Sequence, residues 1–282
     1  MSGLRIGPAG WSYPQWKGVV YPAAGAHPLE ALARQFDVVE INSSFYQPLK
    51  PEVAQLWVNK IQRNPRFRFT AKMFQRFTHA RILEDGEVEQ FKEGLRPLLR
   101  AGRLGALLMQ FPWAFRFTAE NREFFIRLRR QFHEFPLVAE MRHSSWMAEE
   151  AIGTFLDYRV GFCNIDQPEA IRAMPPTAFL TSGIGYARLH GRGPGHLYSE
   201  AELAEWTRRI EKAGRYAERM FVIFCNDAGA KSIVNALQLQ ARIAGVRAPV
   251  PAELRRRYPV ELESFGARRA EQQSLFTAFT AA

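Results

Sequence analysis

Short apolar runs recur along the chain and end in polar residues, and three of them end in two polar residues placed two positions apart. Glu40 and Asn42 end one such run, and Arg188 and His190 end another. Successive side chains of a β-strand point to opposite faces, so the two polar residues of each pair share one face. The runs alternate with helical patterns, which favours βα repetition around a parallel sheet. The pattern therefore predicts strands whose carboxyl ends direct polar side chains toward a common pocket.

We expect eight strands, at residues 5–10, 38–42, 67–72, 106–111, 137–142, 160–166, 186–190 and 221–226. Eight strand–helix units close a TIM-like (β/α)8 barrel, and the length of 282 residues is close to the ~250 typical of that fold. We therefore predict an α/β fold with a single-domain TIM-like barrel at residues 1–248. A C-terminal extension at 249–282 is expected to be packed on the barrel or partly disordered.

The segments between the strands carry recognisable helix starts. Ser199, followed three residues later by Glu202, forms a capping box, and Thr118 or Asn121 is placed to cap an earlier helix. Residues 168–182 contain two adjacent prolines and have weak helical periodicity. We expect this segment to replace a full helix by a loop.

The net charge of +10 and the pI of about 9.9 add an attraction for anions over the whole surface. Much of the excess lies in arginine-rich stretches such as 122–130 and 255–257, which are typical of solvated helix faces. Nucleic acid is therefore an alternative partner to a small anionic ligand, and charge alone does not favour it.

No apolar stretch approaches the ~20 residues that span a bilayer, and residues 1–6 lack the features of a signal peptide. We expect a soluble cytoplasmic protein with no membrane partner. Cys163 and Cys225 lie in separate strand runs without a CxxC or His–Cys spacing, so neither a disulfide framework nor a zinc module is predicted. No cofactor is predicted, and a divalent metal stays an open alternative.

Several motifs occur in an order that resembles the YecE-like family, also called domain of unknown function 72. They comprise Trp11, Tyr13 and Trp16; Glu40, Asn42 and Tyr46; Lys72, Thr78 and His79; Gln110 and Pro112; Glu140, Arg142, His143 and Trp146; Asp166 and Pro168; Arg188, His190, Arg192 and Tyr198; and Asn226 with Asn235. The resemblance extends to about Leu237 and implies a TIM-barrel-like fold without an established activity. Where such proteins usually carry two asparagines, this chain has Cys225 and Asn226; by alternation we expect Cys225 to face the helices and Asn226 the pocket.

Ligand sites of such barrels lie at the carboxyl ends of the strands, which gives a set of candidate residues. We predict Glu140, Asp166 and His190 as catalytic residues. The predicted ligand-binding residues are Trp11, Glu40, Asn42, Lys72, Gln110, Arg142, Arg188, Arg192, Tyr198 and Asn226. Because buried polar groups need partners, this set must either form a self-satisfying network or bind a ligand.

The first interpretation is an electropositive pocket that binds a phosphate- or carboxylate-bearing ligand. Arginine forks match the oxygens of such groups, and the glycine-containing segments 191–195 and 227–231 follow the last two strands, where barrels commonly bind phosphate. Plain turn geometry explains those glycines equally well. A hydrolase would use Glu140 or Asp166 as base and His190 as acid, with Arg142 and Arg188 stabilising negative charge.

Three alternatives stay open. A glycosidase-like enzyme would pair Glu40 with Glu140 and stack sugars on aromatic side chains, which the chain offers at Trp11, Tyr13, Trp16, Tyr46, Trp113 and Trp146. A metal enzyme would use Glu140, Asp166 and His190 as ligands, although the nearby cations oppose this. A non-catalytic nucleic-acid-binding protein would use the basic surface and exposed aromatics. His79 and His143 also follow strand ends, and we expect His79 to serve as a loop residue.

Overall fold

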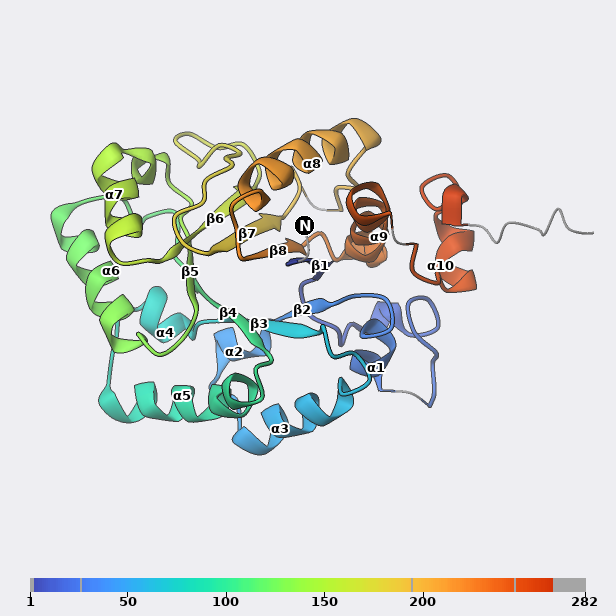
Figure 1. Cartoon of the computed structure of the whole chain (residues 1–282), viewed down its shortest axis with the longest axis horizontal. Coiled ribbons are helices and arrows are strands. Elements are labelled where there is room, and N and C mark those ends of the chain that lie inside the picture. Colours follow the sequence, from blue (N-terminus) through green and yellow to red (C-terminus); the bar gives the residue numbers. More distant parts are fainter. Residues whose placement is uncertain (1–2, 26, 194, 246, 266–282) are drawn as a thin grey trace, which may run out of the picture.

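The computed structural model describes residues 3–25, 27–193, 195–245 and 247–265, and all statements below concern these residues. Its strands form one parallel sheet in the order β1-β8-β7-β6-β5-β4-β3-β2, which curls into a nearly closed barrel (Figure 1). The strands are β1 (Leu4–Pro8), β2 (Val38–Ile41), β3 (Arg68–Lys72), β4 (Leu104–Gln110), β5 (Leu137–Glu140), β6 (Gly161–Asp166), β7 (Ile184–Leu189) and β8 (Arg219–Phe224). The predicted TIM-like barrel and its eight strands are confirmed.

The barrel closes between β1 and β2 through very little pairing. The Gly10 N–H donates to the Glu40 carbonyl at 2.8 Å, and an isolated bridge joins Ala9 to Glu40. Closer to the start of β1, a Cβ atom at Gly7 would lie 2.0 Å from the Val38 carbonyl oxygen. Only glycine therefore allows the two strands to approach there.

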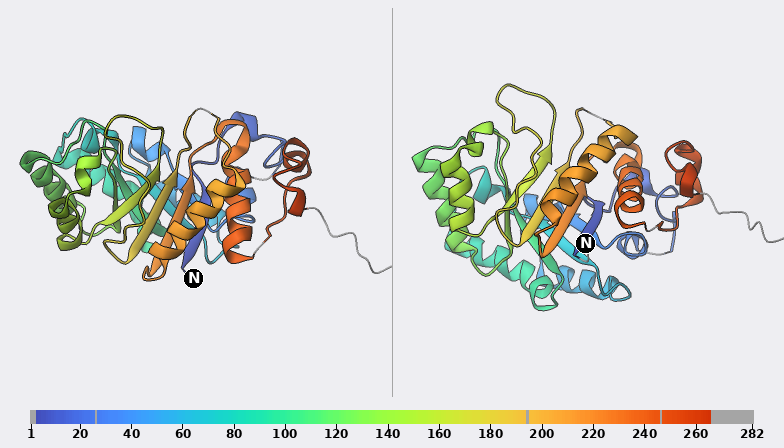
Figure 2. Two further views of the ribbon diagram at one scale, coloured as in Figure 1. Left: turned by 90° about the horizontal axis from the view of Figure 1, so that it is seen from above. Right: turned by 45° about the horizontal axis from the view of Figure 1, so that its top comes forward.

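Helices cover the outside of the barrel (Figures 1 and 2). The α-helices are α1 (Pro28–Leu32), α2 (Ser43–Tyr46), α3 (Pro51–Lys60), α4 (Gln75–Thr78), α5 (Asp85–Arg100), α6 (Ala119–Gln131), α7 (Glu149–Asp157), α8 (Glu200–Gly214), α9 (Lys231–Ala244) and α10 (Ala252–Arg257). Short 3-10 helices are η1 (Pro14–Trp16), η2 (Ser144–Met147), η3 (Ala228–Ala230) and η4 (Glu263–Phe265). None of the helices in the described ranges is long and apolar enough to cross a membrane.

The predicted caps are present. Ser199 and Glu202 form the complete capping box of α8, with each side chain bonded to the other residue's backbone N–H. Thr118, and not Asn121, is the N-cap of α6 and accepts a hydrogen bond from the Asn121 N–H. These bonds satisfy backbone donors that have no partner inside the helix.

The connection between β6 and β7 contains no helix, as its two prolines predict. Its backbone is instead held by Asn164 of β6: the Asn164 side chain accepts hydrogen bonds from the Thr177 hydroxyl and the Phe179 N–H, and donates to the Phe179 carbonyl. A polar outward side chain thus takes the place of the apolar contact that a covering helix would make.

The described part of the C-terminal extension packs beside α9 (Figures 1 and 2). Leu254 and Leu262 are fully buried, and the Tyr258 hydroxyl donates to the Gly229 carbonyl at 2.7 Å. Residues 266–282, including the apolar end of the predicted extension, lie outside the described residues.

Candidate functional site

A cavity of about 400 Å³ opens at the carboxyl ends of the strands. The residues that line it are Ala9, Tyr13, Asn42, Tyr46, Lys72, Gln110, Arg142, Arg188, His190, Cys225 and Asp227. Six of the predicted site residues are among them: Asn42, Lys72, Gln110, Arg142, Arg188 and His190. Strand ends thus meet in one cavity, as the alternation of polar and apolar positions predicts.

Arg188 is the centre of a buried network on the floor of this cavity. Its Nη2 contacts Glu40 Oε1 at 2.8 Å, and its Nη1 contacts Glu140 Oε2 at 2.5 Å and Gln110 Oε1 at 3.0 Å. Both carboxylates are fully buried and Arg188 is nearly so. Removing a charge from water is costly unless it is paired, so one guanidinium offsets two buried acids, one from β2 and one from β5.

The carboxylate of Glu140 is held in its ionised form. Burial alone would raise its pKa, but Arg188, His190 and Arg142 outweigh burial and keep the pKa well below its ordinary value. Glu40 has further support, because the Tyr186 hydroxyl lies 2.9 Å from its Oε2 and 2.8 Å from the Thr70 hydroxyl. Glu140 is therefore a structural anion, and both acids are held in place by hydrogen bonds within the network.

Two other cationic side chains line the cavity and have hydrogen-bond donors without a partner among the described residues. Lys72 Nζ makes no hydrogen bond or ion pair with the described residues and lies 4.2 Å from the centre of the Phe45 ring. Burial, followed by the charge of Arg188, lowers the Lys72 pKa. Arg142 uses its Nε to reach Glu140 Oε1 at 2.9 Å, while neither of its terminal nitrogens has a partner among the described residues.

His190 lies between the floor network and the cavity. Its Nε2 is 3.3 Å from Arg188 Nη1 and 3.7 Å from Glu140 Oε2. Burial and the Arg188 charge lower the His190 pKa, which favours neutral imidazole at pH 7. A neutral ring is poorly prepared to donate a proton as a general acid.

Asp227 was not predicted as a site residue, and Tyr13 was predicted only as a stacking aromatic of the glycosidase alternative, yet both line the cavity. The Tyr13 oxygen lies 2.9 Å from Asp227 Oδ2 and also 2.9 Å from the Ala9 carbonyl oxygen. Burial raises the Asp227 pKa to about 6, against the opposing effect of its hydrogen bond with Tyr13. Asp227 follows the last predicted strand by one residue, so only its position after a strand end could have pointed to it.

Two alternation predictions are wrong, one of them at the end of β8. Cys225 lines the cavity, whereas Asn226 faces α9, where its side-chain amide donates to Asn235 Oδ1 and to the His196 carbonyl, both at 3.0 Å. The run was apolar on both faces, so the sequence did not reveal which face was inside.

Asp166, the second of these predictions, also lies outside the cavity. It pairs in register with Leu189, while Ile165 pairs with the inward-facing Arg188, so the Asp166 side chain points toward the outer layer. There it hydrogen-bonds Tyr198, whose pKa is raised by burial and then by this carboxylate. Tyr198 is likewise buried, with its hydroxyl accepting from the Gly191 N–H at 2.7 Å. Neither residue reaches the cavity.

Arg192 and Trp11 do not line the cavity either. The Arg192 side chain is 60% exposed and lies 3.8 Å from Glu202. Trp11 packs edge-on against Trp57 of α3, with ring centres 4.8 Å apart. The loop containing Gly195 is tied to α9, because Lys231 Nζ donates to the Gly195 carbonyl. No described residue of segment 191–195 lines the cavity.

The remaining aromatic and histidine candidates also lie partly inside and partly outside the cavity. Trp16 and Trp146 are fully buried core residues, whereas Tyr46 lines the cavity and is 67% exposed. His79 bonds the Thr78 hydroxyl, and His143 caps η2. No three His, Cys, Asp or Glu side chains of the described chain converge as a metal site, because Asp166 points away from Glu140 and His190.

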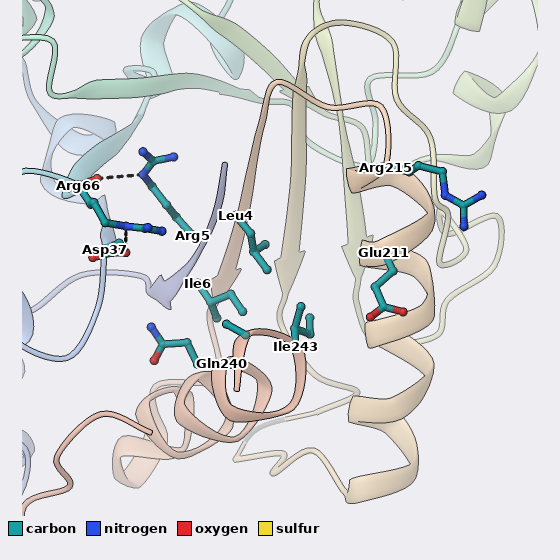
Figure 3. Close-up of a pocket in the computed structure, with 10 residues that line it drawn as sticks. Leu4, Arg5, Ile6, Asp37, Arg66, Glu211, Arg215, Gln240 and Ile243 are labelled. Carbon is teal, nitrogen blue, oxygen red and sulfur yellow. Dashed lines mark hydrogen bonds and ion pairs between the residues drawn. The ribbon is translucent and has the colours of Figure 1, made fainter. Parts of the chain in front are cut away.

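A larger cavity of about 670 Å³ lies at the opposite end of β1, between α8 and α9 (Figure 3). Leu4, Ile6 and Ile243 supply apolar lining. Among its charged groups, Arg66 Nε contacts Asp37 at 2.9 Å, and Arg5 donates to the Arg66 carbonyl. Glu211 and Arg215 are exposed to solvent. In barrels of this type ligand sites lie at the other end, so the smaller cavity is the candidate site.

Comparison with known proteins gives a consistent family. The model of "Protein of unknown function DUF72" matches residues 5–257. The UPF0759 protein YunF of Bacillus subtilis is 25% identical over 267 residues, covering 84% of this chain and 93% of that protein. The UPF0759 protein YecE of Escherichia coli K12 is 35% identical over 114 residues, 40% of this chain and 39% of its own length.

Solved structures agree with this result. A DUF72 family protein of Thermotoga maritima is 27% identical, with a TM-score of 0.76 over 86% of this chain and 99% of its own. A DUF72 family protein of Enterococcus faecalis, at 22% identity, shares the fold with a TM-score of 0.77 over 86% of this chain and 95% of its own. With the family match extending over nearly the whole chain, this protein belongs to the DUF72 family of proteins of unknown function.

Proposed function

We propose that the protein binds a small oxyanion, a phosphate or carboxylate group, in the cavity at the carboxyl ends of its strands. The observation that carries the proposal is that Lys72 and Arg142 both line the cavity with donors that have no partner among the described residues. An ammonium or guanidinium that is partly withdrawn from water without an acceptor is unfavourable. An anion would supply the missing acceptors.

The two cations offer complementary contacts. The terminal nitrogens of Arg142 form a planar fork that matches two oxygens of one phosphate or carboxylate, and the Lys72 ammonium adds a point charge. Arg188 contributes mainly through its field, because Glu40, Glu140 and Gln110 already occupy its terminal nitrogens. It also fixes the carboxylate that orients Arg142.

The alternative functions have less support. A glycosidase acid needs a raised pKa, whereas the pKa of Glu140 is lowered and both acids are bound to Arg188. The same low pKa and occupied oxygens make Glu140 a poor base for hydrolysis. For nucleic acid, the arguments are the net charge and the exposed Tyr46 and Trp113.

Isothermal titration calorimetry with inorganic phosphate tests the proposal. We expect wild-type protein to bind phosphate, and Lys72→Met and Arg142→Gln each to weaken binding at least about tenfold, which corresponds to ~1.4 kcal/mol. Lys92→Met is the matched control for Lys72, because Lys92 also lies over a phenylalanine ring, at 5.6 Å from Phe132, but outside the cavity. Arg255→Gln, on α10, is the control for Arg142.

Two outcomes would overturn the proposal. One is equal weakening by the cavity variants and their controls. The other is the absence of phosphate and carboxylate binding together with oligonucleotide binding that falls steeply with salt and survives both cavity substitutions. The second outcome would favour the nucleic-acid alternative, because phosphate-backbone contacts release counterions and make affinity salt-dependent.

A further inference from the structure

The Tyr13 hydroxyl has more acceptors than hydrogens to give them. Its oxygen lies 2.9 Å from the Ala9 carbonyl oxygen and 2.9 Å from Asp227 Oδ2. A hydroxyl carries one hydrogen, and a carbonyl and an ionised carboxylate are both pure acceptors. Two full hydrogen bonds at these distances require a second hydrogen. A protonated Asp227 can supply this second hydrogen, because its Oδ2–H group would donate to the Tyr13 oxygen.

We propose that Asp227 is the proton-transfer residue of the cavity, and that an oxyanion bound at Lys72 and Arg142 enters together with one proton held between Asp227 and Tyr13. The inference rests on the proposed function for its ligand. It replaces Asp166 and Glu140 as the acid–base group, since the former faces the outer layer and the latter is locked on Arg188.

The surroundings of Asp227 favour a proton that can be exchanged near neutral pH. Groups from several elements act on the carboxyl: Tyr13 after β1, Glu40 of β2, Arg188 of β7, Cys225 after β8 and Ser232 of α9. Burial and Glu40 raise the Asp227 pKa, whereas Tyr13, Ser232 and Arg188 lower it, and the balance lies at about 6. The Cys225 thiol, whose pKa burial raises, stays protonated and neutral.

Proton transfer in this site is balanced in atoms and charge. The Oδ2–H bond of Asp227 breaks, and the proton moves to an oxygen of the bound anion, forming an O–H bond there. Asp227 is left as a carboxylate, and the Tyr13 hydroxyl turns its own hydrogen from the Ala9 carbonyl to Oδ2. Tyr13 keeps its proton throughout because burial raises its pKa far above neutrality. Tyr13 is thus a positioning residue for Asp227.

Infrared difference spectroscopy tests the stored proton without any ligand. Subtracting the spectrum of Asp227→Asn from that of the wild type, we expect the carbonyl band of a protonated carboxyl at pH 5 that vanishes with a midpoint near pH 6. Tyr13→Phe should move this midpoint upward, because the hydrogen bond of Tyr13 is stronger to the charged carboxylate than to the neutral acid. Identical wild-type and Asp227→Asn spectra at pH 5 would overturn the inference.

Calorimetric titration with sulfate, which stays a dianion across this range, tests the coupling. We expect wild-type affinity to rise about tenfold from pH 8 to pH 5 with uptake of up to one proton, whereas Asp227→Asn should bind tightly and without proton uptake throughout. Asp166→Asn is the matched control, a buried aspartate outside the cavity, and should retain the wild-type dependence. Proton uptake that survives in Asp227→Asn would overturn the coupling. Failure of sulfate, phosphate and carboxylates alike to bind at any pH would overturn the proposed function, while the infrared band would still decide whether Asp227 stores a proton.

Discussion

The two cavities at opposite ends of β1 differ in how their charged side chains are satisfied. The larger one, between α8 and α9, has an apolar lining, and its Arg66 is paired with Asp37 near the surface. The smaller one has a fully buried acid–base floor and two cations, Lys72 and Arg142, with unused donors. Surface pairs contribute little to stability, whereas a buried charge left without a partner is costly. Unsatisfied chemistry, and not volume, therefore distinguishes the candidate site.

The largest expected effect is on the free energy of unfolding, which should respond differently to substitutions in the two cavities. Arg188→Met should lower the free energy of unfolding by about 3–5 kcal/mol, because it leaves Glu40 and Glu140 buried without their cation. Arg66→Met, in the larger cavity, should cost at most about 1 kcal/mol. Urea unfolding of the two variants checks this difference. If Arg188→Met were no more destabilising than Arg66→Met, the floor network would not be a buried ion cluster.

The next largest effect is on the stability of the protein at acidic pH. Glu140 has a lowered pKa in the folded protein, so its contribution to stability is full above the ordinary carboxyl pKa of ~4.3 and is lost as the pH falls through the folded value. Glu140→Gln should cost about 3 kcal/mol at pH 7 and flatten the loss of stability below pH 4.5. Unfolding curves between pH 7 and 2 measure both. An unchanged slope would mean that Glu140 is not held ionised by Arg188.

A smaller effect should be an increase in the free energy of unfolding, in contrast to the two decreases above. Because burial lowers the Lys72 pKa, the charged ammonium is unfavourable in the unliganded protein. Lys72→Met should therefore raise the free energy of unfolding by roughly 1 kcal/mol while weakening anion binding, a trade of stability for function. Lys92→Met should not raise stability, since Lys92 lies 3.5 Å from Glu134. Thermal unfolding without ligand measures the pair, and a destabilised Lys72→Met protein would contradict the comparison.

The smallest effect lies in the larger cavity. Glu211→Gln and Arg215→Gln, both on the α8 side of that cavity, should each change the free energy of unfolding by no more than about 0.5 kcal/mol. They should also leave phosphate affinity unchanged. A loss of phosphate binding in either variant would relocate the ligand site to the amino-terminal end of the barrel.

Alternation along the strands predicted much of the site, because the polar residue at a strand end usually marks the inner face. It placed Glu40, Gln110 and Glu140 correctly around Arg188. It failed on β6 and β8, where both faces of the strand are buried and the polar residue serves an outer contact. Asn164 and Asp166 face the segment without a helix and Tyr198, and Asn226 faces Asn235 of α9.

The acid–base group was missed for a different physical reason. Asp227 follows the strand in a short turn, where the alternation of a strand no longer applies. Its partner Tyr13 is distant in sequence and comes from the segment after β1. The pairing depends on β1 lying beside β8 in the sheet. The eight strands themselves were predictable, since each is a local pattern of apolar residues.

The sparse pairing between β1 and β2 gives Arg188 a mechanical role. Apart from the Gly10 and Glu40 contact, no ladder of hydrogen bonds fastens this seam among the described strands. The Glu40 side chain of β2, however, reaches through the barrel interior to Arg188 on β7. This ion pair holds β2 in place from inside the barrel. Local opening of the barrel should therefore begin at β2, and the rate of amide hydrogen exchange in β2 should report the strength of the Glu40–Arg188 ion pair.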